Sequence, residues 1–207
     1  MVQLYHLQVF QYDRLIHNIY LIHYNMNYLN QASYIDADYS TLIPRYKREF
    51  KIPITYSEAE IRKFEEAIDR STSTGKRNYA LLLLATRLGM RSGDIAKLSL
   101  CEVDFGGNRI NIVQEKTGEP LELPLLPEIK GALEDYILHA RPDSTGDSVF
   151  LRSNAPHQQI TTSVIRFATA KYFGKAGINV SGKKHGPHTF RSSLASSMVN
   201  DDVPYEA

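Results

Sequence analysis

Three short stretches of the 207-residue chain carry side chains that could bind or transfer a phosphate group. Arg91 stands in LGMRSGDIAKL, Lys116 stands in QEKTGEPLELPL, and His188 and Arg191 stand in HGPHTFRSSLASSM. Attack on a phosphodiester builds negative charge on its non-bridging oxygens, and two guanidinium groups can stabilise that charge through paired hydrogen bonds. A lysine on a turn can protonate the departing alkoxide. By themselves, the residue types suit the binding of an anion, of which a phosphate is one example.

The spacing of these residues adds to the pattern without deciding it. His188 and Arg191 are three apart at the start of a predicted helix, so they share a face beside free backbone N–H groups that favour anions. Asp94 follows Arg91 by three residues and could pair with its guanidinium group. Taken singly, however, helix-flanking arginines and turn lysines are usually solvated or salt-bridged, and a His-x-x-Arg spacing often arises by chance.

The elements that would position these residues are mostly helices. Ser57 and Glu60 form a capping box that starts a helix at about residue 57, and the polar STSTGK run is expected to end it. The apolar run 79–88 predicts a central buried helix that ends at Gly89, and a short helix follows over 94–98. Further helices are predicted over 127–138, over 164–174 and from about residue 189.

Two predicted strands interrupt the helices. Residues 109–113 and 121–125 lie beside the turn signals GGN and KTGE, which predicts a hairpin or a three-stranded antiparallel sheet. Lys116 falls at the tip of the hairpin. The predicted fold class is therefore α+β and mainly α, with a small antiparallel β-sheet.

The first 44 residues have a different pattern. Apolar side chains recur there at steps of four and three, which predicts one long amphipathic helix with the face Leu15, Ile19, Ile22, Met26 and Leu29. Such a helix cannot close a core alone and should pack on something else. A proline-bounded extended stretch follows it. We therefore expect a first domain over 1–44, a linker over 45–54 and a second domain over 55–207.

The net charge of +1 gives no overall case for nucleic-acid binding, so the case rests on where the charges lie. One basic cluster lies in the predicted linker and consists of Arg45, Lys47, Arg48 and Lys51. The stretch from Arg166 to Arg191 contains no Asp or Glu, and its lysines are Lys171, Lys175, Lys183 and Lys184. We expect both sets to contact DNA phosphates with an affinity that falls as salt rises.

Composition disfavours several other classes of protein. The single cysteine, Cys101, excludes an internal disulfide framework, and no cluster of cysteine and histidine has zinc-finger spacing. No apolar run reaches the roughly 18 residues of a membrane span, and the first residues lack the layout of a signal peptide. We expect a cytoplasmic protein with no membrane partner, no metal and no cofactor.

The combination of the three stretches is far more specific than each one alone. An arginine after a buried helix, a Lys-Thr-Gly turn before a Leu-Pro-Leu strand, and His-x-x-Arg opening a helix occur in this order and separation. This arrangement resembles the catalytic domain of tyrosine recombinases, the phage integrase family, over roughly residues 55–205. The segment ASYIDADYSTLIPRYKR resembles the end of that family's helical core-binding domain and its linker.

The resemblance implies a role for each candidate residue. Arg91 and Arg191 would hold the scissile phosphate, with Asp94 as acidic support. His188 would contact the phosphate or manage a proton, and Lys116 would protonate the departing 5′-oxygen. The implied function is site-specific recombination or integration of double-stranded DNA, performed by homo-oligomers on DNA.

The resemblance also implies a nucleophilic tyrosine, placed further along the chain than the sixteen residues that follow Arg191. Tyr205 is interpreted as structural, because nothing after it could position its hydroxyl at the phosphate. We therefore expect a truncated catalytic domain that does not cleave DNA by itself unless another chain supplies the tyrosine.

Two other hypotheses remain open from the sequence. The chain could be a non-catalytic remnant of an integrase that binds duplex DNA through its basic stretches. It could also be a helical interaction protein without a DNA role, which predicts that the four candidate residues lie apart in space. A type IB topoisomerase uses similar phosphate chemistry, but the compact size and the linker resemble an integrase more.

Overall fold

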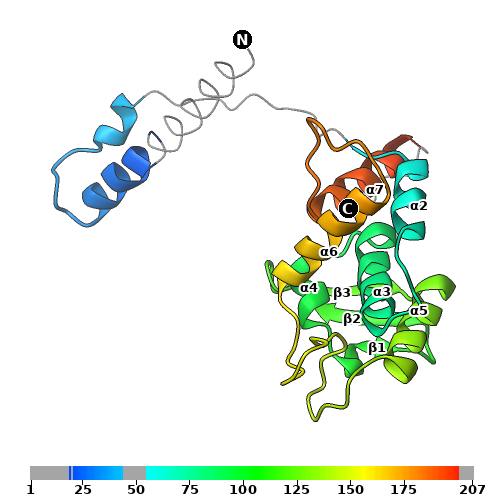
Figure 1. Ribbon diagram of the computed structural model, residues 1–207. Coiled ribbons are helices and arrows are strands. Elements are labelled where there is room, and N and C mark those ends of the chain that lie inside the picture. The colour runs from blue at the N-terminus through cyan, green and yellow to red at the C-terminus, as the bar shows by residue number, and fades with distance from the viewer. Residues whose placement is uncertain (1–18, 20, 44–54, 201–207) are drawn as a thin grey trace. The chain divides into compact units, whose positions relative to one another are not determined.

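The structure is a computed structural model that describes residue 19 and residues 21–43 and 55–200 (Figure 1). Contacts divide the chain into two compact units, Met1–Ile52 and Pro53–Ala207, and each is described by itself. The predicted linker with its basic cluster lies outside the described residues: Arg45, Lys47, Arg48 and Lys51. Their contact with DNA, and the bounds predicted for the two domains and the linker, stay predictions.

The described part of the first unit is a helix followed by a short 3-10 helix. Helical residues run from 21 to 31, and η1, Tyr39–Leu42, follows after a loop. Asp38 caps η1, because its carboxylate accepts a hydrogen bond from the backbone N–H of Ser40 at 2.9 Å. The predicted helix is therefore confirmed over 21–31, whereas Leu15 lies outside the described residues.

The side chains of this helix leave most of its surface exposed within the described part of the first unit. Met26 and Leu29 of the predicted apolar face are partly buried, but Ile22 is 47% exposed. Tyr24 and Tyr28 on the same helix are 71% and 58% exposed. The narrow apolar pattern therefore gives no closed core there, as the sequence predicts.

The second unit begins with two capped helices. Helix α2, Glu58–Glu66, starts at the predicted capping box, in which Ser57 and Glu60 bind each other's backbone N–H groups. Helix α3, Ser73–Arg87, starts within the polar run that was expected only to end α2. The Thr72 hydroxyl accepts a hydrogen bond from the backbone N–H of Gly75 at 3.0 Å, and this cap sets the start of α3. The predicted start at residue 79 is wrong because apolar periodicity does not extend through a polar first turn.

Helix α3 is the centre of the second unit, as its apolar run predicts. Its residues 81–84 are all leucines with at most 1% of their surface exposed. It contacts α2 and four further helices, namely α4 Ser92–Lys97, α5 Pro127–His139, α6 Thr162–Lys175 and α7 His188–Asn200. Figure 1 shows these helices gathered around α3. The predicted positions of α5, α6 and α7 are confirmed to within a few residues.

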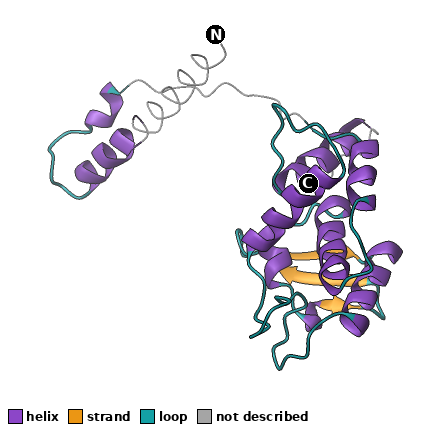
Figure 2. Ribbon diagram, in the orientation of Figure 1, coloured by secondary structure: helices purple, strands orange, loops and turns teal. Residues whose placement is uncertain are grey.

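A three-stranded antiparallel sheet completes the unit, and Figure 2 shows its strands side by side. The strands are β1 Val103–Asp104, β2 Arg109–Val113 and β3 Pro120–Pro124. Ile110 pairs with Leu123 and Ile112 with Leu121, so the inward side chains of β2 face those of β3. The predicted class, mainly α with a small antiparallel sheet, is confirmed. No helix among the described residues is long and apolar enough to cross a membrane.

Candidate active site

The turn between α3 and α4 presents the first candidate arginine. Gly89 adopts a φ of +60°, and the backbone N–H of Met90 donates to the carbonyl of Leu84 at 3.2 Å, which closes α3. Arg91 follows as the N-cap residue of α4 and is partly buried. Its Nη1 donates to Oε1 of Gln114, the residue after β2. The guanidinium group is thus fixed by a neutral acceptor.

Helix α7 brings the second arginine to the same turn. Arg191 Nη1 donates to the carbonyl oxygen of Gly89 at 2.9 Å. A Cβ at Gly89 would lie 3.3 Å from Leu194 Cδ2 and 3.6 Å from Arg191 Cγ, so the turn packs closely on α7. None of the ion pairs formed by the described residues includes Arg91 or Arg191. Both guanidinium groups therefore keep donors for an anion.

His188 opens α7 and is exposed. It lies three residues before Arg191, so the two side chains share a face of the helix. The backbone carbonyl of His188 accepts a hydrogen bond from the Ser192 hydroxyl at 3.5 Å. The imidazole therefore stands at the N-terminal end of α7, where the helix dipole favours an anion. The backbone N–H groups of Thr189 and Phe190 already donate to the carbonyls of Gly186 and Pro187, at 3.0 and 3.3 Å.

The hairpin β2–β3 is anchored to this turn at its base. Asp94 is 7% exposed, and its Oδ1 accepts a hydrogen bond from the backbone N–H of Glu115 at 2.9 Å. The predicted pairing of Asp94 with Arg91 is wrong, because the aspartate is engaged by the hairpin backbone and Gln114 holds the arginine. Asp94 supports the site by fixing the hairpin rather than the guanidinium group.

Lys116 lies on the hairpin turn directly after these anchored residues, and its side chain is exposed. The contacts of Gln114 with Arg91 and of Arg191 with Gly89 gather the hairpin base, the α3–α4 turn and α7 in one place. These three segments therefore lie together, whereas the convergence of all four candidate side chains stays a prediction. The first contact joins residues 23 apart in the sequence, and the second joins residues 102 apart.

The lysines predicted to contact DNA have different surroundings. Lys171 and Lys175 are exposed on α6, with their Nζ atoms 5.5 and 5.9 Å from the ring centre of Tyr172, and Lys184 is exposed. Lys183 is instead paired, because its Nζ lies 2.9 Å from Glu60 Oε1. Glu60 on α2 therefore supplies an acidic partner to the stretch that has no acidic residue of its own, and Lys183 is less available to DNA than expected. DNA contact by the other three lysines stays a prediction.

The tyrosines of the described second unit belong to its interior. Tyr56, Tyr136 and Tyr172 are at most 4% exposed, and Tyr79 is partly buried under the guanidinium of Arg70. Burial raises the pKa of the Tyr56 and Tyr136 hydroxyls above the ordinary value. A buried hydroxyl that resists ionisation is a poor nucleophile. Tyr205 lies outside the described residues.

Three contacts around the site involve residues that the sequence patterns did not single out. Gln114 binds Arg91, Lys97 forms an ion pair of 2.6 Å with Glu115, and the Ser193 hydroxyl accepts a hydrogen bond of 2.9 Å from the backbone N–H of Tyr56. Gln114 stands directly before the turn of Lys116, at the base of the predicted hairpin, and this place in the sequence could have drawn attention to it. Nothing in the sequence marks the partner of Ser193.

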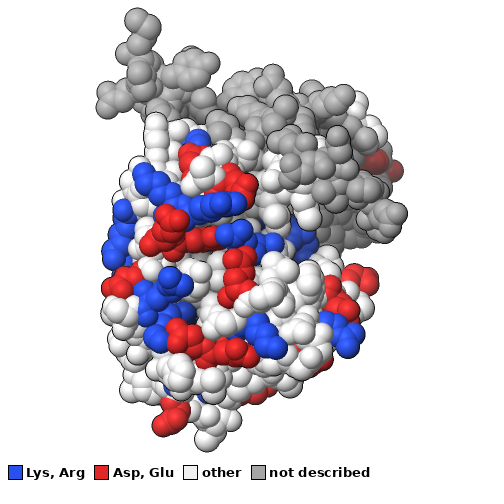
Figure 3. Space-filling view, turned by 90° about the vertical axis from the view of Figure 1, so that its right-hand side faces the viewer, with Lys and Arg blue, Asp and Glu red and all other residues white. Residues whose placement is uncertain are grey.

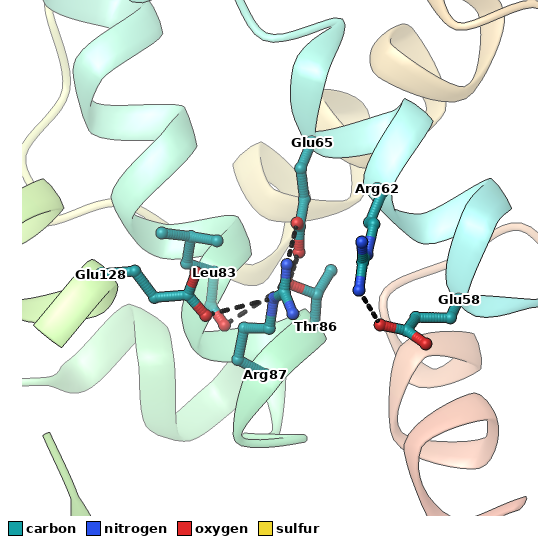
Figure 4. A network of polar contacts seen from close by, with 7 residues as sticks. All are labelled: Glu58, Arg62, Glu65, Leu83, Thr86, Arg87 and Glu128. Atoms are coloured by element: carbon teal, nitrogen blue, oxygen red, sulfur yellow. Dashed lines mark hydrogen bonds and ion pairs between the residues drawn. The ribbon is translucent and has the colours of Figure 1, made fainter. Parts of the chain in front are cut away.

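A second cluster of charged residues surrounds Arg87, and its charges are paired within the protein. Arg87 Nη2 lies 2.6 Å from Glu65 Oε2, and Arg87 Nε lies 3.4 Å from Glu128 Oε1 (Figure 4). The Thr86 hydroxyl donates to Glu65 at 2.6 Å.

Figure 3 shows basic and acidic side chains interleaved across the face seen from the right of Figure 1. That face therefore carries no field of a single sign.

Comparison with known proteins agrees with this arrangement. A Sinorhizobium fredii protein, y4rA, whose name places it among integrases or recombinases, is 35% identical over 149 residues, which cover 72% of this chain and 36% of that protein. Tyrosine recombinase XerC of Chlamydia caviae is 31% identical over 163 residues, which cover 77% of this chain and 50% of the relative. The chain thus spans between about a third and a half of the length of these two relatives.

The fold is that of a tyrosine-recombinase catalytic domain. A lambda integrase dimer bound to a COC′ core site superposes with a TM-score of 0.66 at 15% identity, over 85% of this chain and 60% of that chain. The Phage integrase family matches residues 55–207. The chain belongs to the phage integrase family.

Proposed function

We propose that this chain supplies the phosphate-binding part of the catalytic domain of a site-specific recombinase that breaks and rejoins double-stranded DNA. The observation that carries the proposal is the bond from Arg191 to the Gly89 carbonyl, which joins α7 to the turn that carries Arg91. Neither arginine forms an ion pair with a described carboxylate. Two guanidinium groups that lack a described carboxylate partner, one on the α3–α4 turn and one on α7 beside it, suit a phosphodiester better than a protein partner.

In the proposed reaction a tyrosine oxygen attacks the phosphorus, the bond to the 5′-oxygen breaks, and a 3′-phosphotyrosyl link forms. Arg91 and Arg191 stabilise the charge on the non-bridging oxygens, and His188 contacts the phosphate or manages a proton. Lys116 donates a proton to the departing 5′-oxygen from the exposed turn. Attack by the freed 5′-hydroxyl on the phosphotyrosyl link reverses the step and rejoins DNA.

We further propose that no tyrosine in the described part of the second unit is the nucleophile. Tyr56, Tyr136 and Tyr172 would have to leave the core to reach a phosphate, and the Tyr136 hydroxyl already accepts a hydrogen bond from the backbone N–H of Leu151. Cleavage then depends on a tyrosine outside these residues or on one from another chain.

A non-catalytic duplex-binding remnant is the second candidate function. The exposed side chains of Lys171 and Lys175, one helical turn apart on α6, favour it because they can contact DNA phosphates without any reaction. The proposed partner in both cases is double-stranded DNA. The lambda integrase structure named above is a dimer on DNA, and a homo-oligomer on DNA is proposed for this chain by analogy.

A covalent-trapping experiment tests the proposal. The chain is incubated with nicked duplexes from the flanks of its gene, and protein–DNA adducts are sought on a denaturing gel, with salt-dependent duplex binding measured in parallel. The variant Arg191→Ala is compared with Arg62→Ala, which removes an exposed arginine that pairs with Glu58.

An adduct that Arg191→Ala abolishes and Arg62→Ala preserves supports catalysis, and peptide mapping then identifies the linked tyrosine. A link to Tyr56, Tyr79, Tyr136 or Tyr172 would contradict the proposal about the nucleophile. Duplex binding without an adduct, weakened only in Arg191→Ala, favours the non-catalytic candidate. A chain that does not bind duplex DNA at all contradicts both.

A further inference from the structure

Gln114 occupies the base of the turn that carries Lys116. Its backbone N–H donates to the carbonyl of Glu119 at 2.9 Å, and its own carbonyl accepts from the N–H of Gly118 at 2.8 Å. These two bonds close the loop around Lys116. The position of the lysine therefore follows the position of Gln114.

The side chain of Gln114 joins this loop to the first arginine. Its Oε1 accepts from Arg91 Nη1 and lies 3.4 Å from the hydroxyl of Thr117. An amide oxygen orients a guanidinium group without cancelling its charge, whereas a carboxylate would neutralise it. Because a guanidinium has five N–H donors, the contact with Gln114 leaves Arg91 further donors for a phosphate.

The neighbouring residue gives the hairpin a second anchor on the same segment. The backbone N–H of Glu115 donates to buried Asp94, and its carboxylate pairs with Lys97 at 2.6 Å. The ion pair is exposed on both sides and contributes little, so Asp94 and Gln114 are the main anchors. Of these two, only Gln114 touches a residue with a proposed role at the phosphate.

Resting on the proposed function, we propose that Gln114 is a positioning residue for phosphodiester binding and transfer. It holds the guanidinium of Arg91 in the orientation that meets the phosphate and ties that orientation to the turn of Lys116. The neutral charge of the Gln114 amide is part of this role, because a phosphate binds Arg91 strongly only if no protein carboxylate neutralises the guanidinium group.

The test uses the full chain with ¹⁵N-labelled arginine, titrated with inorganic sulfate as a tetrahedral dianion. The Nε–H signals of Arg91 and Arg191, assigned through Arg91→Lys and Arg191→Lys, report on binding at each guanidinium. We expect both signals to shift with one common affinity in the unaltered chain. Gln114→Glu should weaken that common affinity at least tenfold, by placing a competing carboxylate beside Arg91.

The matched control is Gln158→Glu, which adds the same charge at an exposed glutamine on the loop before α6. It should change the sulfate affinity by less than twofold. Gln114→Met removes the acceptor but keeps the length of the side chain, and should weaken binding about threefold. In a chain that also carries Arg91→Ala, Gln114→Met should have no further effect on the Arg191 signal, because the group that Gln114 positions is gone.

Two results would overturn the inference alone: Gln114→Glu behaving like Gln158→Glu, or Gln114→Met weakening binding equally with and without Arg91→Ala. The latter result would mean that Gln114 acts only on the general structure of the hairpin. A different outcome, in which neither arginine signal of the unaltered chain responds to sulfate or to duplex DNA, overturns the proposed function and the inference with it. Thr117→Val, which removes only the weaker contact to Gln114, provides a milder variant with an expected effect below twofold.

Discussion

The arginines on the two sides of the turn at Gly89 differ in the charge of their partners. Arg87 ends helix α3 and is held by the carboxylates of Glu65 and Glu128. Four residues later, Arg91 donates to the amide of Gln114 and Arg191 donates to a backbone carbonyl, and neither pairs with a carboxylate among the described residues. The first arrangement satisfies the positive charge inside the protein, whereas the second leaves it for a ligand. An arginine without a carboxylate partner is therefore the better candidate for binding an anionic ligand.

The pKa values agree with this difference for Arg87. Hydrogen bonding to Glu65 raises the pKa of the Arg87 guanidinium above its ordinary value, although partial burial works in the other direction. The contact partner Glu65 has a side chain that is 8% exposed, so water screens the pair weakly. Arg87 is thus a structural cation that ties α3 to α2 and α5.

The largest effect is expected on removing the buried carboxylate of this structural cluster. Glu65→Ala leaves the Arg87 guanidinium and the Thr86 hydroxyl without their main partner, which should lower the free energy of unfolding by about 3–5 kcal/mol. Urea unfolding of the chain measures the loss. The exposed pair of Arg62 and Glu58 is the control, since Glu58→Ala should cost only about 0.3–0.5 kcal/mol. Equal losses for the two variants would remove the distinction between the clusters.

The next effect concerns the unpaired arginines and should appear in binding rather than in stability. Arg191→Ala loses one hydrogen bond to a carbonyl, so the free energy of unfolding should fall by only about 1 kcal/mol. Duplex affinity should fall roughly tenfold, and the slope of log affinity against log salt should decrease by about 0.9 if one phosphate contact is lost. Fluorescence anisotropy at several salt concentrations measures both. A variant with normal affinity and a large loss of stability would make Arg191 a second structural cation.

A third prediction addresses the turn that separates the two clusters. Gly89→Ala places a Cβ at a φ of +60° and 3.3 Å from Leu194, so both backbone strain and crowding against α7 oppose it. We expect a loss of about 1–2 kcal/mol in thermal or urea unfolding. Duplex binding should weaken as well, because Arg191 bonds to the carbonyl of this residue. Unchanged duplex binding at reduced stability would show that the turn contributes to the fold but not to phosphate binding.

The smallest effect is expected at the pair of Glu60 and Lys183. The hydrogen bond from Lys183, followed by that from the Ser57 backbone, holds the pKa of the Glu60 carboxyl below its usual value of 4.5. Such a carboxyl stabilises the fold above pH 4.5 and loses this contribution as the pH falls through its folded value. Glu60→Gln should therefore reduce the loss of stability between pH 6 and pH 3, measured by urea unfolding. A loss as large as in the unaltered chain would show that this pair does not contribute to the pH dependence.

The elements could be predicted where their signals are local. The capping box at Ser57, the end of α3 at Gly89 and strand β2 each depend on a few neighbouring residues, and the structure has them as expected. The start of α3 could not be placed, because the Thr72 cap precedes any apolar repeat. Likewise the sequence marks Arg91 and Asp94 as a natural pair, yet the hairpin competes for both.

The sequence by itself determined the order of the elements, the mainly helical class with its small sheet, and the residue types suited to a phosphate. Those properties follow from periodicity, caps and side-chain chemistry, which act over a few residues. Only the tertiary structure decided which cations are neutralised: Lys183 meets Glu60 across 123 residues, whereas Arg91 and Arg191 meet no described carboxylate. Electrostatic pairing depends on distance in space, and the fold alone sets that distance.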